Sequence, residues 1–357
     1  MATKLTNSFV IPSTPSKGQP VTAPSVAPAR GRTANELKSA TPLFHRDGFE
    51  RASSKRASPS REQEHGHIDN DGFVIKSKNG KVAGAGVPAS TNIDLKYFGG
   101  GVLDKPVVSN MYVGDYFKTA QGQKDVAHND AFMKDYVQNK DTVGIWHQYG
   151  VDAGTTQDSH LLGGKFSSTA TITQKQIETM LQKAVADGTV KPGAQSIYNF
   201  VLPPGATLKM DDGSSSKQGL GGFHSSIHTP DGQEVFYSAI AYSKGRNGID
   251  FTNGNAQDNI SITESHEISE AVTDPHVQDA IDDNNNAELG WMDMNNGENG
   301  DIEVNDAPPG TPLSTMYGRM DGYAVQKIWS QKDKTNETKA KNPGPLEPLP
   351  KPSTSVA

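Results

Sequence analysis

The sequence predicts an α+β domain, a central mixed sheet with packed helices, flanked by disordered N- and C-terminal tails. Three observations predict it. Apolar residues recur with strand-like and helix-like spacing only in the middle of the chain, a helical segment there sets His and Glu four positions apart, and both ends are polar and rich in Pro and Lys. Helices and sheets each bury an apolar face against another element, so this interleaving indicates helices packed on a sheet.

The two ends of the chain differ in composition from the middle. Residues 1–95 are basic, rich in Ser, Pro, Lys and Arg, and almost without apolar periodicity. Such a segment buries too little surface to offset the entropy lost on ordering. We therefore expect a disordered arm, either a solvated tail or a translocation leader of a secreted bacterial protein. Residues 331–357 are polar and Pro-rich and predict a second disordered tail. One globular domain is expected over residues 96–330.

Within this domain, the spacing of apolar residues predicts the elements in order. Alternating apolar residues indicate strands, and apolar residues three and four apart indicate helices, the second of which stops at Gly188. The expected order is a strand, two helices, two strands, a further helix and a late strand, over residues 107–113, 125–138, 173–188, 196–205, 234–243, 262–274 and 322–330.

The composition excludes several classes of function. The formal net charge of −7 argues against general nucleic-acid binding, which needs a basic surface. The sequence has no cysteine, so a metal ion must be held by His, Asp, Glu or backbone oxygen. No apolar run approaches the roughly 20 residues of a membrane span, and the N-terminal region lacks the apolar core of a secretory signal. We expect secretion by a route without a cleavable signal peptide, with a cytoplasmic location as the alternative.

The segment ITESHEISEAVTDP, residues 262–275, carries the strongest functional signal. Residues four apart on a helix share a face, so His266 and Glu270 are predicted to bind one metal ion, with Glu267 beside them. This zincin-like H-E-x-x-E helix differs from the H-E-x-x-H zinc signature only in its last position. Zinc accepts carboxylate oxygen as well as imidazole nitrogen, and zinc is therefore the expected cofactor.

A catalytic zinc ion usually has three protein ligands and an open position for water, so a third ligand must come from another segment. Glu298 and Asp301, in GENGDIEVND, lie beyond a loop long enough to return to the helix and are the leading candidates. Asp274 is eight residues past the histidine of the motif, about 12 Å along an unbroken helix, and a helix-ending role is favoured for it. His224 and His228, in GFHSSIH, are further candidates, although ordinary surface or hydrogen-bonded roles are favoured.

Glu267 is the predicted general base. Zinc lowers the pKa of bound water toward about 7, and a carboxylate within hydrogen-bond reach takes that proton and passes it to the leaving group. The expected function is zinc-dependent hydrolysis of a protein or cell-wall peptide, because peptide hydrolysis is the commonest use of this arrangement. The alternative is an amphipathic acidic helix that exposes Glu264, Glu267 and Glu270 to water.

Six segments in order resemble the phosphate-induced, or Exordium-like, proteins of plants and their bacterial relatives. They are VVSNMYVGDYF, QSIYNFVLPPG, the turn GGFHSSI, SHEISEAVTDP, GENGDIEVND and YAVQKIWS, over residues 107–330. The resemblance supports the fold and the site more than a particular activity. A second functional class therefore stays open, a non-catalytic secreted or surface interaction protein with a structural metal ion or none. Glu267 favours the enzyme, because a structural metal site needs no free carboxylate beside its ligands. Glu270 favours the second class, because the H-E-x-x-H signature of zinc peptidases has His at this position.

Asn and Asp are dense between residues 279 and 306, and hard oxygen ligands suit calcium, which is the alternative cofactor. The EF-hand spacing is not met, and Asx-rich loops form turns without an ion. Gly-rich stretches of the chain lack the Lys and the strand-loop-helix setting of a phosphate loop. Nucleotide binding is therefore not expected.

Overall fold

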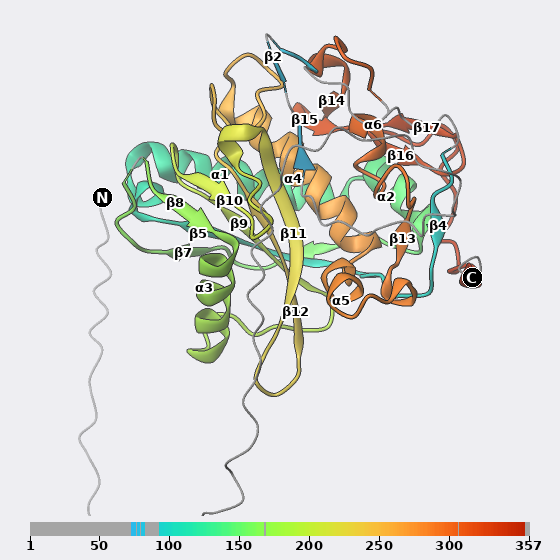
Figure 1. Cartoon of the computed structure of the whole chain (residues 1–357), viewed down its shortest axis with the longest axis horizontal. Helices are drawn as coiled ribbons and strands as arrows, with labels where there is room; N and C mark the ends of the chain where they lie inside the picture. Colours follow the sequence, from blue (N-terminus) through green and yellow to red (C-terminus); the bar gives the residue numbers. More distant parts are fainter. Residues whose placement is uncertain are drawn as a thin grey trace, which may run out of the picture. The chain divides into compact units, whose positions relative to one another are not determined.

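The computed structural model describes residues 73–75, 77–78, 80–82, 93–167, 169–305 and 307–353. They belong to one compact unit, residues 63–357. Helices pack against a mixed sheet in this unit, which confirms the α+β class predicted from the sequence (Figure 1). None of the helices within the described ranges has the length and apolar character needed to cross a membrane.

A seven-stranded sheet forms the centre of the fold. Its strands are β1 (Phe73–Val74), β5 (Val107–Val113), β6 (Thr155–Thr156), β7 (His160–Leu162), β9 (Ser196–Val201), β11 (Leu220–His228) and β12 (Glu234–Ile240). They are ordered β1-β11-β12-β9-β5-β6, and β7 also pairs with β5. The strands from β12 to β6 and β7 run parallel, whereas β11 is antiparallel to β12 and β1 is antiparallel to β11.

Four helices cover this sheet. Three were predicted at residues 125–138, 173–188 and 262–274, and the fourth, α2, was not. They are α1 (Ala120–Gln138), α2 (Lys140–Trp146), α3 (Gln174–Ala186) and α4 (Ala256–Thr273). Helix α4 begins at Ala256, six residues before the predicted start. Its cap is Asn255, whose side chain accepts from the backbone of Asp258, a start signal that lies upstream of the segment singled out in the sequence.

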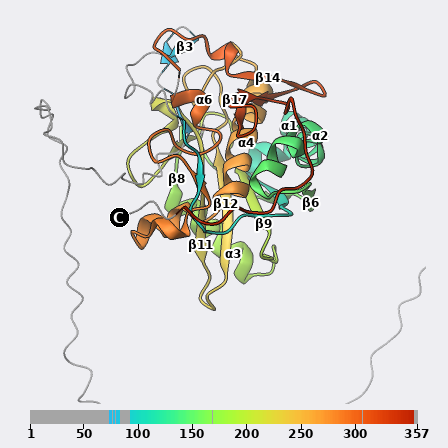
Figure 2. The same ribbon diagram turned by 90° about the vertical axis from the view of Figure 1, so that its right-hand side faces the viewer.

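Each face of the sheet has its own core. Val108 and Ile197 pack on the side of α1, α2 and α4, while Met111 and Phe200 pack with α3 on the opposite side. Successive side chains of a strand point to opposite faces, so the same strands supply both cores. Figure 2 shows α1, α2 and α4 grouped on one side. Helix α4 therefore lies beside α1 on the same face of the sheet, with α4 against β11 and β12 and α1 against β5 and β6.

The remaining elements are short. Five two-stranded ribbons surround the main sheet in the described part of the chain, pairing β2 with β3, β4 with β13, β8 with β10, β14 with β15, and β16 with β17. Their bounds, with those of two short helices, are β2 (Ser77–Lys78), β3 (Lys81–Val82), β4 (Lys96–Tyr97), β8 (Thr171–Thr173), β10 (Thr207–Lys209), β13 (Trp291–Met292), β14 (Tyr317–Met320), β15 (Tyr323–Gln326), β16 (Ile328–Ser330), β17 (Thr335–Glu337), α5 (Val277–Asp282) and α6 (Ile302–Asn305).

Helix α4 is buried along its length. Every residue from Asp258 to Thr273 is buried, so the alternative of an acidic helix exposed to water is wrong. The helix lies beside the long strands β11 and β12 (Figure 1). On its other side, Tyr136 of α1 donates to the carbonyl of Ser265 (2.9 Å), and Trp146 of α2 donates to Oγ of Ser269 (3.2 Å). These hydrogen bonds fix the rotation and height of α4 against the sheet.

The segment GGFHSSI was expected to form a turn, but it lies within strand β11. The strand pairs with β12 from Gly222 opposite Ile240 to His228 opposite Glu234. The expectation was wrong because the α4 face of this strand carries glycine and polar residues, which hide the alternation of apolar side chains by which a strand is recognised. The predicted late strand is also modified, since it divides into β15 and β16 at Lys327.

The two predicted tails differ from the expectation where the structure describes them. Within the predicted arm 1–95, β1 pairs with β11, and Ile75 and Leu95 are buried; the rest of the arm lies largely outside the described residues. Within the predicted tail 331–357, residues up to 353 are described. There β17 pairs with β16, Ala340 is buried in the core, and the backbone N–H of Glu347 donates to the carbonyl of His147 at 2.9 Å. Backbone hydrogen bonds and an ion pair hold this polar segment against the rest of the domain. The amino-acid composition of the segment does not reveal such contacts, so disorder was predicted instead.

Shortening the chain at Ser330 is expected to lower the melting temperature by about 5 °C or more, because it removes β17, the buried Ala340 and the hydrogen bond to His147. The matched control ends at Ser353 and is expected to melt like the full chain. Circular dichroism melts of the three chains provide the measurement. Equal melting temperatures for all three would show that residues 331–353 contribute no stability.

Glu264 of α4 makes the stability of the fold depend on pH. Its Oε1 accepts from Nδ2 of Asn199 at 2.9 Å. Burial raises the pKa of Glu264 from 4.5 to about 8, although the hydrogen bond from Asn199 lowers it. The folded protein therefore keeps a proton that the unfolded chain releases near pH 4.5. The resulting stability is fully present below that pH and is lost as the pH rises toward 8, at about 1.4 kcal/mol per pH unit.

The variant Glu264→Gln keeps a neutral, hydrogen-bonding side chain at all pH values. We expect its unfolding free energy to fall less than that of the natural protein between pH 5 and pH 8. Urea unfolding at several pH values measures the difference. A constant difference between the two proteins across this range would contradict the assignment of the buried proton to Glu264.

Candidate metal centre

Three side chains of α4 converge on its sheet-facing side. His266, Glu267 and Glu270 are 0%, 1% and 3% exposed. One ligand atom from each lies within 4.8 Å of the others. Nε2 of His266 is 3.0 Å from Oε2 of Glu270, which is the contact that their spacing of four residues provides on a helix.

Strand β11 brings a second histidine to the helix. Nδ1 of His224 lies 3.7 Å from Oε2 of Glu267 and 3.7 Å from Oε2 of Glu270. Two residues earlier, Gly222 allows the close approach of strand and helix, since a Cβ there would lie 2.7 Å from Oε1 of Glu267 and 2.8 Å from the carbonyl oxygen of Ala239. A side chain at this position would displace the carboxylate of Glu267.

The loop after β13 returns to α4, as the sequence predicted for Glu298 and Asp301. Oε1 of Glu298 lies 3.6 Å from Nε2 of His224, and Oδ1 of Asp301 lies 3.7 Å from Nε2 of His266. The backbone N–H groups of Asp301 and Gly300 donate to the carboxylate of Glu270. The loop thus supplies two further carboxylates and also holds a carboxylate of the helix in place.

Gln326 of β15 orients His266, a role that the sequence reasoning missed. Its Oε1 lies 3.2 Å from Nδ1 of His266, while its Nε2 donates to the carbonyl of Gly300 at 2.7 Å. Because an amide oxygen only accepts, Nδ1 of His266 carries the proton, and Nε2 turns its lone pair toward Glu270. Such an outer partner fixes the tautomer of a metal-binding histidine. The available signal was the polar pair Gln326 and Lys327 inside the otherwise apolar run YAVQKIW.

Burial dominates the electrostatics of this cluster. It raises the pKa of Glu267, Glu270 and Glu298 well above the usual range, and neighbouring carboxylates raise the pKa of Glu267 and Glu298 further. It also lowers the pKa of His224 and His266 to about 4. The imidazoles are therefore neutral at pH 7, and the carboxylates ionise only if a cation compensates them.

The donors present fit a metal ion. Both carboxylate oxygens of Glu267 and Oε1 of Glu298 are buried without a hydrogen-bond partner among the described residues. Two groups of potential ligands, one of His266, Glu267 and Glu270 and the other of His224, Glu270 and Glu298, overlap at Glu270. Neutral imidazole nitrogen together with carboxylate oxygen suits zinc or a similar transition ion, whereas calcium takes oxygen ligands alone.

The side chains of the other two sequence candidates have partners outside this donor set. His228 is on β11 four residues after His224, about 13 Å along a strand, and its Nε2 contacts Oδ1 of Asp279 at 3.0 Å. Asp274 is the C-cap residue of α4, where its Oδ1 accepts from the backbone of Gly290 at 2.7 Å. Burial raises the pKa of Asp274 to about 7. Its carbonyl oxygen lies 3.3 Å from Nε2 of His224, so Asp274 positions a member of the cluster through its backbone.

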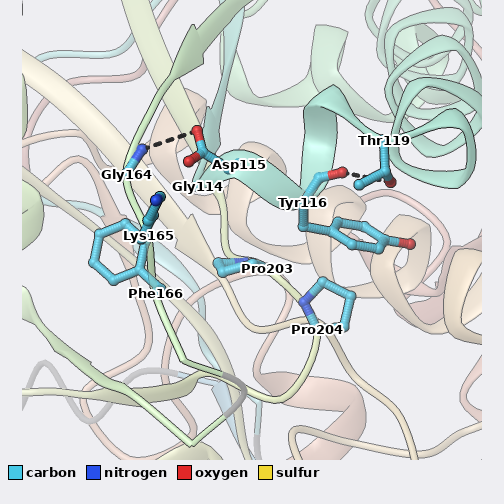
Figure 3. A pocket seen from close by; sticks show the side chains of 9 residues that line it. All are labelled: Gly114, Asp115, Tyr116, Thr119, Gly164, Lys165, Phe166, Pro203 and Pro204. Atoms are coloured by element: carbon cyan, nitrogen blue, oxygen red, sulfur yellow. Dashed lines mark hydrogen bonds between the residues drawn. The ribbon is translucent and has the colours of Figure 1, made fainter.

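A separate pocket of about 410 Å³ opens where β5, β7 and β9 end. Figure 3 shows Phe166, Tyr116, Pro203 and Pro204 around it, with Asp115 accepting a hydrogen bond from Gly164 at its rim. None of its lining residues belongs to the cluster around His266. The pocket and the candidate metal centre are therefore distinct features.

No family model matches the chain, and no curated protein matches it. Among solved structures, the chain is similar to the crystal structure of metalloproteinase-II from Bacteroides fragilis, with 12% sequence identity and a TM-score of 0.24. The similarity covers 54% of this chain and 46% of the other, so the chain spans about half the length of that protein. A similarity of this size does not define a shared fold or activity, and the resemblance to Exordium-like proteins stays a prediction.

Proposed function

We propose that this protein is a metal-dependent hydrolase, most simply a zinc metallopeptidase, with its active site at His266, Glu267 and Glu270. The observation that carries the proposal is the buried carboxylate of Glu267, which has no hydrogen-bond partner among the described residues and lies beside two neutral imidazoles. If His266 and Glu270 are the ligands from the helix, the carboxylate of Glu267 is available to take a proton from water.

The residues would divide the work as follows. His266 and Glu270 hold the ion, with Glu298 or His224 completing the ligand set, since Glu270 forms a group with both. A bound zinc ion lowers the pKa of water and polarises a carbonyl. Glu267 takes a proton from the attacking water and delivers it to the leaving amine. Gln326 keeps the Nε2 lone pair of His266 directed toward the ion.

The loop that carries Glu298 and Asp301 is the part of the candidate site that a substrate can reach from solvent. The side chain of Asp301 is 27% exposed, whereas that of His266 is fully buried. A peptide would therefore approach over this loop, next to Oδ1 of Asp301. Because the loop also donates backbone hydrogen bonds to Glu270, its displacement by a substrate would directly affect the ligand geometry.

A second candidate is a non-catalytic interaction protein with a structural ion. The complete burial of His266 favours it, because structural sites are closed, whereas catalytic sites keep an open position. The two candidates share the same ligands and differ in whether Glu267 meets a substrate.

The test is hydrolysis of peptide libraries by the full-length protein, read by mass spectrometry. We expect cleavage by the zinc-loaded protein, no cleavage after chelation and recovery when zinc is returned. Absence of cleavage by a zinc-loaded protein across broad libraries would leave the structural-ion candidate as the better one.

A further inference from the structure

A second group of histidines and carboxylates lies where the β11–β12 hairpin meets α5. It consists of His228 at the end of β11, Glu234 at the start of β12, and His276 and Asp279 at the start of α5. We name it the hairpin cluster. Nothing in the proposed hydrolysis uses these residues, and the sequence reasoning placed only His228 among its candidates, for a different site.

The backbone explains why these four side chains meet. His228 and Glu234 are directly opposite each other in the antiparallel pair of β11 and β12, so their side chains share one face of the sheet. His276 and Asp279 are three residues apart at the start of α5 and share one face of that helix. A cross-strand pair thus faces a helical pair, and each pair contributes one imidazole and one carboxylate.

The distances are those of a compact ligand set. Nε2 of His228 lies 3.0 Å from Oδ1 of Asp279, and Nδ1 of His276 lies 2.9 Å from Oε2 of Glu234. Ligand atoms of His228, Glu234 and Asp279 all lie within 4.8 Å of one another. Two ligands bound at about 2.0–2.1 Å to one tetrahedral zinc ion lie roughly 3.3 Å apart. Small side-chain shifts would therefore place an ion among these atoms.

The surroundings of His276 select the nitrogen that faces the cluster. Its ring packs edge-on against Phe236 with centroids 5.2 Å apart. On the other side lies Gly101, where an added Cβ would come within 2.5 Å of Nε2 of His276. Packing therefore leaves Nδ1 directed at Glu234. The side chains of His228 and Asp279 are 54% and 23% exposed, so an ion reaches this cluster from solvent.

We propose that the hairpin cluster is a second transition-metal site, with His228, Glu234 and Asp279 as ligands and with His276 holding the carboxylate of Glu234 in place through its Nδ1. One imidazole and two carboxylates are donors that zinc accepts in tetrahedral geometry, with a water molecule in the fourth position. The ion ties the β11–β12 hairpin to α5. Since α5 follows Asp274, whose carbonyl lies 3.3 Å from His224, the ion also steadies one wall of the candidate metal centre.

The alternative is that the cluster binds no metal ion and that its two imidazoles are protonated. Each imidazole then pairs with its carboxylate as an ion pair, His228 with Asp279 and His276 with Glu234. Ion pairs of this exposure contribute little to stability. Metal counting separates the two states, because the ion-pair state binds no zinc.

The experiment counts zinc per chain in the full-length protein after chelation, zinc reloading and desalting at pH 8. We expect about two ions for the natural protein. The double variant His228→Gln with Asp279→Asn preserves side-chain size and should bind one ion fewer. His266→Ala should also bind one ion fewer, and the combination of all three substitutions should bind none. The matched control, Asp158→Ala with His160→Ala, removes the same residue types from a segment outside both clusters and should bind as the natural protein does.

The outcomes separate this inference from the proposed function. A double variant with the same zinc content as the natural protein overturns the second site. One ion that is lost in the double variant but kept in His266→Ala supports the second site and contradicts metal binding at the helix. If the double variant does not fold, Asp279→Asn alone is counted in the His266→Ala background with cobalt, whose absorption reports the remaining site directly; an unchanged spectrum overturns the inference.

Discussion

Glu267→Gln is expected to lose peptide hydrolysis by a factor of about 100 or more, the usual scale of general acid-base assistance. Glutamine keeps the size of the side chain but does not accept a proton from water. The carboxylate of Glu267 is 1% exposed, and an added Cβ at Gly222 would lie 2.7 Å from it, so the amide occupies the same space. The variant should therefore keep the fold and the zinc content of the natural protein. Turnover of one library-derived peptide and zinc per chain are the two measurements.

The matched control is Glu264→Gln, three residues earlier on the same helix. Glu264 is equally buried but hydrogen-bonds to Asn199, outside the donor set. It should retain full turnover. If Glu267→Gln lost its zinc instead, Glu267 would be a ligand and not the base. If both variants lost turnover equally, the effect would belong to the helix as a whole rather than to proton transfer.

The second large effect is expected for His266→Ala, which should lose one zinc ion per chain and all zinc-dependent hydrolysis. The imidazole is the only nitrogen ligand that α4 supplies within the motif, and Nε2 lies 3.0 Å from Oε2 of Glu270. Its removal leaves only carboxylates in the motif, and carboxylates suit magnesium and calcium better than zinc. Elemental analysis of the purified variant measures the loss. Retention of the ion would contradict the assignment of His266 as a ligand.

Gln326→Leu tests the same ion without removing a ligand. It deletes the hydrogen bond to Nδ1 of His266 and the one to the carbonyl of Gly300. Loss of such an outer partner weakens metal affinity by about 10–100-fold. Competition with a chelator of known affinity measures the change. A folded Gln326→Leu protein with unchanged affinity would show that packing alone orients the imidazole.

The sequence predicted those parts of the fold that have an apolar stripe. Helices α1 and α3 and strands β5, β9 and β12 follow from regular spacing of apolar residues, and the structure contains each of them. Strand β11 was missed because Gly222 and His224 occupy the face that an apolar residue would normally fill. The residues that build the site thus remove the pattern by which their strand is recognised.

The sequence predicted those parts of the candidate site that depend on the spacing of residues within one helix or loop. His266 and Glu270 are one helical turn apart, so their proximity follows from helix geometry. Glu298 was expected from its composition and loop length. His224 and Gln326 lie 42 positions before and 60 positions after His266 in the chain. Their position next to His266 depends on strand order and register, which no short sequence motif encodes.

The position of Gln326 has a consequence for when the candidate metal centre forms during synthesis. Helix α4 leaves the ribosome 60 residues before the amide that orients His266. While the chain is still growing, nothing fixes the tautomer of His266, and Glu270 lacks the backbone donors of Gly300 and Asp301. If the proposed zinc site is correct, selective uptake of zinc follows the docking of β15 and is a late event in the maturation of the protein.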